Sequence, residues 1–87
     1  MKKLRVAEDG ATEELNSLSF NSEEVFLIVD EDGKNVYIWI GCNASVRKRF
    51  AAARAAGELK RQDLAYSNIT IDEEYEPAGW RSKILTA

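Results

Sequence analysis

Two uninterrupted apolar runs dominate the pattern of hydrophobic and polar positions along the chain. The first lies within Glu23–Asp30 (EEVFLIVD) and the second within Val36–Gly41 (VYIWIG). Runs of this length that are rich in branched and aromatic residues are typical of strands buried on both faces of a sheet. The turn-forming residues EDGKN separate the two runs, so we predict a hairpin of two adjacent central strands.

Shorter alternating segments predict the remaining strands. Leu4–Ala7 is predicted to be a first strand, and the polar stretch after it a loop with a short strand around Glu14–Leu18. Ser67–Asp72 (SNITID) alternates as a strand near the end of the chain. Pro77 suits the first turn of a helix, so Pro77–Leu85 is predicted to be a short helix.

One long helix is predicted between the central hairpin and the last strand. Asn43 or Ser45 is its candidate N-cap, and the helical pattern continues to Gln62 or Leu64. The order strand, hairpin, long helix, strand, short helix predicts an α+β fold, in which a mixed sheet has helices packed on its faces.

The long helix has two apolar faces. At about 100° per residue, one side gathers Ala51, Ala52, Ala55, Ala56 and Leu59. The opposite side gathers Val46, Phe50, Ala53, Gly57 and Leu64, and an arginine stripe between the two comprises Arg47, Arg54 and Arg61. Small side chains allow close approach to a sheet, so we expect the alanine side to pack inward. Phe50 then either covers a sheet edge or a loop, or it is the centre of a partner-binding surface with an arginine rim.

Composition and charge exclude several classes of function. With 87 residues, 45% of them hydrophobic, the chain is predicted to be one globular domain over residues 1–87. A net charge of −3 argues against nucleic-acid and membrane-surface binding. The chain has no histidine and one cysteine, Cys42, so an enzyme is not expected and Cys42 is predicted to be structural. No apolar run suits a signal peptide or a membrane span, so a cytoplasmic location is expected.

Two acidic runs carry no predicted chemistry. In Asp30–Gly33 (DEDG) the glycine comes at the fourth position, whereas an EF-hand loop needs it at the sixth. The run is therefore predicted to be a hairpin turn. Asp72–Glu76 (DEEYE) is predicted to be a solvated strand end and not a catalytic pair of carboxylates.

Residues 22–59, SEEVFLIVDEDGKNVYIWIGCNASVRKRFAAARAAGEL, resemble a repeat of the gelsolin/villin family. The likeness lies in a buried strand after an acidic pair, a strand that ends in glycine, and an Asn/Ser cap that leads into an alanine-rich helix. KLRVAED, LNSLSFNSEEVF and ITIDEEYEPAGW extend it nearly end to end. The resemblance implies one gelsolin-like domain, with a sheet of about five strands sandwiched between one long and one short helix. The related cofilin-like fold shares this architecture.

The resemblance also implies actin or an actin-like protein as the partner. In the family, the long helix of certain repeats lies in the hydrophobic cleft of actin. Carried onto this chain, the face involved comprises Arg47, Phe50, Arg54, Gly57, Glu58 and Arg61, with Val46 beside them. The family's best actin-binding repeat has an aliphatic residue where this chain has Arg54, and Phe50 would supply that contact one turn earlier.

Two functions follow from the resemblance. A cytoskeletal regulator with one repeat would sequester actin monomers or cap filament ends, because severing and bundling usually need two linked sites. The alternative is a structural or assembly domain with the same fold that does not bind actin and contacts other proteins or itself.

Repeats of this family commonly hold calcium between the acidic pair and a glutamate in the first turn of the long helix. The acidic pair corresponds to Glu23 and Glu24, but the helix position is Lys48. A lysine cannot ligate calcium, which takes oxygen ligands, so the site is predicted to be degenerate and no cofactor is expected. We predict that Lys48 pairs with Glu24. The alternative is that Lys48 and its neighbours Arg47 and Arg49 are all solvated.

Overall fold

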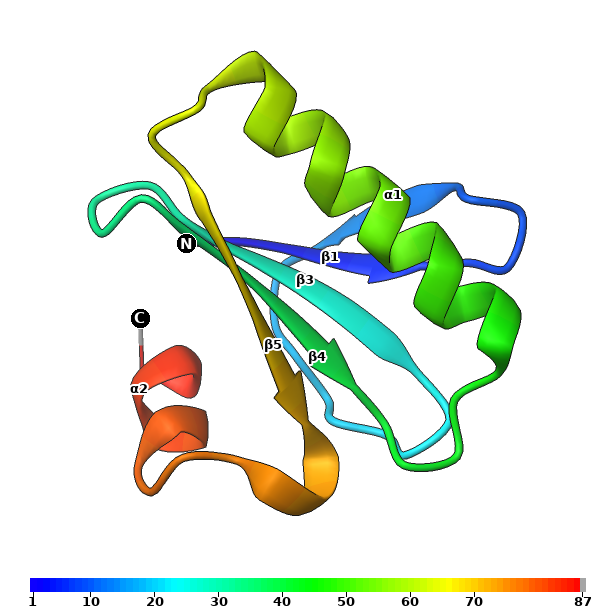
Figure 1. The fold of residues 1–87 in the computed structure, drawn as a ribbon. Helices are drawn as coiled ribbons and strands as arrows, with labels where there is room; N and C mark the ends of the chain where they lie inside the picture. Colours follow the sequence, from blue (N-terminus) through cyan, green and yellow to red (C-terminus); the bar gives the residue numbers. More distant parts are fainter. Residues whose placement is uncertain (87) are drawn as a thin grey trace.

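A five-stranded mixed sheet forms the centre of the molecule (Figure 1). The computed structural model describes residues 1–86. The strands are β1 (Lys2–Val6), β2 (Thr12–Leu15), β3 (Val25–Asp30), β4 (Asn35–Ile40) and β5 (Ser67–Asp72). Their spatial order is β2-β1-β3-β4-β5. All neighbours are antiparallel except β4 and β5, which are parallel.

The predicted hairpin of β3 and β4 is confirmed. The two strands pair in register from Val25 opposite Ile40 to Asp30 opposite Asn35, and every residue of β3 is buried. In the turn, Gly33 N donates to Asp30 Oδ1 at 3.0 Å, and Lys34 adopts a left-handed conformation with φ 55°. The DEDG run is therefore a hairpin turn, as predicted.

The long helix α1 (Val46–Gln62) connects the parallel strands β4 and β5 across one face of the sheet. Its N-cap is Ser45, whose side chain accepts a hydrogen bond from Lys48 N at 3.2 Å. The alanine side packs inward as predicted, with Ala51, Ala52 and Ala56 buried. Their cluster includes Val6, Val25, Leu27, Val36 and Ile38. Parallel strands need such a crossover connection, and the small side chains let α1 lie close to the sheet.

The short helix α2 (Trp80–Leu85) covers the opposite face, so the predicted sandwich is confirmed (Figure 1). Trp80 and Ile84, one turn apart, are its buried residues. They join Leu18, Phe26, Ile28, Tyr37, Trp39 and Ile71 in a second, largely aromatic cluster. Alternate residues of β3 and β4 thus supply the two clusters on opposite faces of one sheet.

Three predicted elements differ from the structure in their bounds. The first strand, predicted at Leu4–Ala7, is β1, Lys2–Val6. The short strand expected around Glu14–Leu18 is β2, Thr12–Leu15, because Leu18 leaves the strand to become buried in the aromatic cluster. The second helix starts at Trp80 and not at Pro77. Pro77 instead precedes it, in a turn closed by a hydrogen bond from Trp80 N to Pro77 O at 3.1 Å. The left-handed Gly79, with φ 77°, sets the start of the helix.

The acidic run after β5 is not the solvated strand end that the sequence suggested. It forms a single turn, η1 (Glu73–Tyr75). Glu73 accepts hydrogen bonds from Ser22 Oγ and Cys42 N, both at 2.8 Å. Glu76 accepts one from Trp39 Nε1 at 2.8 Å and also pairs with Arg81. These carboxylates therefore hold separate loops and α2 in place.

Within residues 1–86, no helix combines the length and apolar character that a bilayer span requires.

Candidate functional site

The outer face of α1 comprises the residues predicted as a partner site: Val46, Arg47, Phe50, Arg54, Gly57, Glu58 and Arg61. Two large apolar side chains stand exposed on it, Phe50 at 68% and Val46 at 63%. Leu64, just beyond the helix, is 80% exposed. Phe50 is thus left largely open to solvent, although it borders the β1–β2 turn. The helix has an inner face that completes the core and an outer face that the domain leaves open to solvent.

The charges on the outer face are mainly available to a partner. Arg61 Nη2 lies 2.8 Å from Glu58 Oε1, one turn away, and both side chains are largely exposed. Arg47 and Arg54 are exposed and form no ion pair with any residue of the described chain, 1–86. Exposed, unpaired arginines beside an apolar centre suit the rim of a protein interface.

Two open depressions border this face on the side of the β1–β2 turn. The first, of about 200 Å³, has Glu8, Asp9 and Gly10 on one wall and Arg47, Phe50 and Arg54 on the other. The second, of about 310 Å³, continues along α1, with Leu4, Leu27 and Leu59 among its lining residues. The first depression, next to Phe50, is lined mainly by charged residues, and the second, which shares Gly10 and Arg54 with it, is the more apolar of the two.

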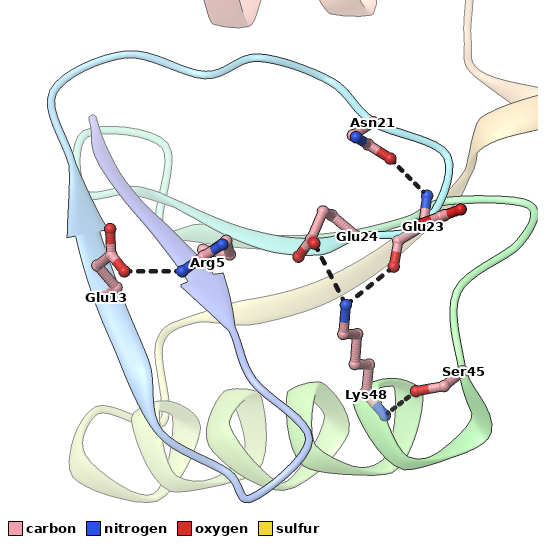
Figure 2. A network of polar contacts seen from close by, with 7 residues as sticks. All are labelled: Arg5, Glu13, Asn21, Glu23, Glu24, Ser45 and Lys48. Atoms are coloured by element: carbon pink, nitrogen blue, oxygen red, sulfur yellow. Dashed lines mark hydrogen bonds and ion pairs between the residues drawn. The ribbon is translucent and has the colours of Figure 1, made fainter.

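The start of α1 is tied to the loop before β3 through Lys48 (Figure 2). Lys48 Nζ lies 3.3 Å from Glu24 Oε1 and 3.1 Å from the carbonyl oxygen of Glu23. The ion pair is partly shielded, because the Lys48 and Glu24 side chains are only 19% and 23% exposed. The expected pairing is therefore present. It offsets part of the unfavourable effect of the helix dipole on a cation in the first turn.

The residues at this position do not fit the calcium ion that the family resemblance implies. Calcium takes six to eight oxygen ligands, and Lys48 supplies a donor where the helix would have to supply an oxygen. No group of three or more Asp, Glu, His or Cys side chains in residues 1–86 is arranged to hold a metal ion.

A second polar cluster surrounds Cys42, at the end of β4. The Cys42 side chain is an exposed free thiol, while its backbone N–H donates to Glu73. Hydrogen bonding to the Glu73 carboxylate raises the pKa of the Cys42 thiol above its ordinary value, which makes the thiol a poorer nucleophile at neutral pH. The structural role predicted for Cys42 therefore belongs to its backbone.

The comparison with protein families assigns the fold. The family model of the gelsolin repeat matches residues 7–79, which is most of the chain. The chain belongs to the gelsolin repeat family. The match includes the central hairpin, α1 and β5, so the outer face described above is that of a gelsolin repeat.

Similar proteins are found among both sequences and structures. The repeat is 34% identical over 50 residues to "Actin depolymerising venom protein gelsolin 1" of Platymeris rhadamanthus, a match that covers 58% of this chain and 13% of that protein. It is similar to the chain in the "Thorarchaeota ProGel/rabbit actin complex", with TM-score 0.85 and 25% identity over 95% of this chain and 97% of that one. The "Thorarchaeota 2DGel3/rabbit actin complex" shares the fold, with TM-score 0.83 and 20% identity over 95% of this chain and 42% of that one.

Sequence reasoning missed the part of the site that the β1–β2 turn of this gelsolin repeat contributes. Glu8, Asp9 and Gly10 line the first depression together with Arg47 and Phe50. The two groups lie about 40 residues apart in the sequence, and no local pattern indicates that they are neighbours. To predict that they are neighbours, the order of all the strands would have been needed, because only the position of β1 beside β3 brings the β1–β2 turn close to α1.

Proposed function

We propose that this gelsolin repeat binds actin through the outer face of α1. The observation that carries the proposal is an apolar centre, Phe50 and Val46, left exposed on a helix whose other face is already buried. The likeness to ProGel supports it, because that protein was solved in complex with actin and resembles this chain over nearly the whole of both chains. The partner is thus actin or an actin-like protein.

In this proposal Phe50 is the anchor and the arginines form the rim. A buried aromatic residue at the centre of an interface can contribute about 2 kcal/mol or more to binding, whereas rim charges mainly set the association rate and its salt dependence. Arg47 and Arg54 would meet carboxylates of the partner without first breaking an ion pair within the described residues. Arg61 would first have to exchange its contact with Glu58.

The described residues present one such face, which favours monomer sequestration or capping of filament ends. Severing and bundling usually need two linked sites. The role proposed is binding and not catalysis, in the cytoplasm, where the proposed partner polymerises. If the same face instead joins two copies of the chain, the repeat is an assembly domain.

Pelleting and seeded elongation of actin filaments separate these functions. A sequestering protein raises the unpolymerised actin in proportion to the protein added. A capping protein stops elongation from seeds at concentrations far below that of actin. If neither effect occurs, and sedimentation equilibrium of the chain alone shows a dimer that Phe50→Ala abolishes, the assembly function replaces the actin proposal.

A further inference from the structure

The Lys48 ammonium group lies at a point where two oxygens of one loop converge. One is the backbone carbonyl oxygen of Glu23, at 3.1 Å, and the other is Oε1 of Glu24, at 3.3 Å (Figure 2). A carbonyl and a carboxylate oxygen side by side are typical ligands of a hard cation. Here the cation is a side chain that belongs to α1.

Hydrogen bonds hold the loop backbone on both sides of Glu23. Gly41 N donates to the carbonyl oxygen of Glu24 at 3.0 Å, and Asn43 N donates to that of Ser22 at 2.8 Å. Within the loop, Glu23 N donates to Asn21 Oδ1 at 2.9 Å. The backbone that carries the Glu23 carbonyl oxygen is therefore positioned by the turn that follows β4, independently of the lysine.

The helix in turn positions the lysine. The backbone N–H of Lys48 donates a hydrogen bond to the side chain of the N-cap Ser45, so the residue is fixed in the first turn. Its side chain is 19% exposed, whereas the neighbouring Arg47 and Arg49 are exposed. A partly desolvated ion pair is screened less by salt than an exposed one.

We propose that Lys48 serves as a built-in cation that fastens the start of α1 to the Glu23–Glu24 loop, and so makes the position of the helix independent of calcium. We call this contact between Lys48 and the Glu23–Glu24 loop the clamp, and it is inferred from the hydrogen bonds described above. Its consequence, that binding through the outer face of α1 needs no calcium, rests on the proposed function.

Thermal unfolding with and without calcium tests the clamp without any use of actin. The unaltered protein should melt at the same temperature in EGTA and in about 1 mM Ca²⁺, a concentration that fills weak calcium sites. Lys48→Glu places a third oxygen group beside Glu23 and Glu24. The melting temperature of this variant in EGTA should be lower than that of the unaltered protein, and calcium should raise it by about 4 °C or more. The added change Glu24→Gln should abolish this rise. Lys60→Glu is the matched control, with the same charge change at an exposed lysine in the last turn, and should show no calcium response.

A double-mutant cycle covers the case in which Lys48→Glu does not fold. Lys48→Met keeps most of the side-chain length and removes the charge. It should lower the melting temperature, and Glu24→Gln should lower it less in the Lys48→Met background than in the unaltered protein. If the two substitutions lowered the melting temperature additively, the clamp would be overturned. A calcium-dependent rise in the melting temperature of the unaltered protein that Glu24→Gln removes would overturn it too. Failure of the unaltered protein to bind actin would overturn only the proposed function.

Discussion

Phe50 and Ala52 lie two positions apart on α1, yet the Phe50 residue is 68% exposed and Ala52 is completely buried. Two positions correspond to about 200° around the helix, so the two side chains point to opposite sides. Ala52 lies in the core cluster over the sheet, and Phe50 lies beside the depression formed with the β1–β2 turn. One helix thus separates the residues needed for folding from those free for binding.

Substitutions at these two positions should therefore change stability very differently. Phe50→Ala should alter the free energy of unfolding by no more than about 0.5 kcal/mol, the usual range for surface changes. Ala52→Leu should cost about 1–3 kcal/mol, because it inserts methylene groups into a close-packed core. Urea unfolding measures both. A loss of about 3–5 kcal/mol for Phe50→Ala, the cost of emptying a core site, would show that Phe50 is buried in solution.

Gly41 should not tolerate a side chain. A Cβ atom there would lie 2.2 Å from the carbonyl oxygen of Ser22 and 2.8 Å from that of Glu24, both backbone atoms. Gly41→Ala should therefore destabilise the domain at the upper end of the usual range, by about 3 kcal/mol, in the same unfolding experiment.

Gly57 provides the matched control for Gly41. A Cβ atom at Gly57 would meet nothing within 4 Å, and alanine is favoured over glycine inside a helix by about 1 kcal/mol. Gly57→Ala should therefore stabilise the domain. If both substitutions lowered the free energy of unfolding equally, this would contradict the close approach at Gly41 and the open space above Gly57.

Local patterns in the sequence predicted the elements whose contacts are local. The β3–β4 hairpin needs two apolar runs and a turn between them, which lie within one short segment. For α1 the local pattern left two candidate caps, Asn43 and Ser45, and two candidate ends, Gln62 and Leu64, and the structure has Ser45 and Gln62. The outer face was predictable for the same reason, because the angle between Phe50 and Ala52 follows from helix geometry alone.

Contacts between distant segments were not predictable from those patterns. Glu73 binds Ser22, 51 residues earlier in the chain, and Cys42, 31 residues earlier. The local sequence alone does not distinguish an acidic run that binds distant partners from one whose carboxylates face solvent. The predicted start of the second helix at Pro77 was wrong because the tethered turn before it delays the helix to Trp80. The Lys48–Glu24 pair was predictable only through the family resemblance.

The hydrogen bonds to Glu73 should make stability depend on pH in the acid range. The Cys42 N–H and the Ser22 hydroxyl, in that order, hold the pKa of Glu73 below its ordinary value of 4.5. A carboxyl group with a lowered pKa in the folded state contributes stability above its unfolded pKa and loses it as the pH falls through the folded one. Stability should therefore fall below about pH 4.5. Glu73→Gln should make this dependence shallower than the charge-matched change Glu74→Gln does, in urea unfolding at a series of pH values. Equal slopes for the two variants would contradict the assigned role of Glu73.

Arg54 should act at the rim of the proposed interface. Arg54→Ala should weaken actin binding less than Phe50→Ala, mainly by slowing association, because rim charges act through long-range attraction. The effect should fade when the salt concentration is raised and the Debye length falls to about 3 Å near 1 M. Association rates at low and high salt measure this. A loss that is independent of salt would show that Arg54 is a buried contact.

The affinity of Phe50→Ala for monomeric actin tests the central claim most directly. At 1.4 kcal/mol per factor of ten, loss of an anchor that contributes about 2 kcal/mol should weaken binding about thirtyfold. Tyr75→Ala is the control, because Tyr75 is an exposed aromatic residue, at 79%, that lies outside the outer face of α1. We predict that Phe50→Ala keeps its stability and loses this affinity, while Tyr75→Ala keeps both. A stable Phe50→Ala variant that binds actin as tightly as the unaltered protein would contradict the proposed function.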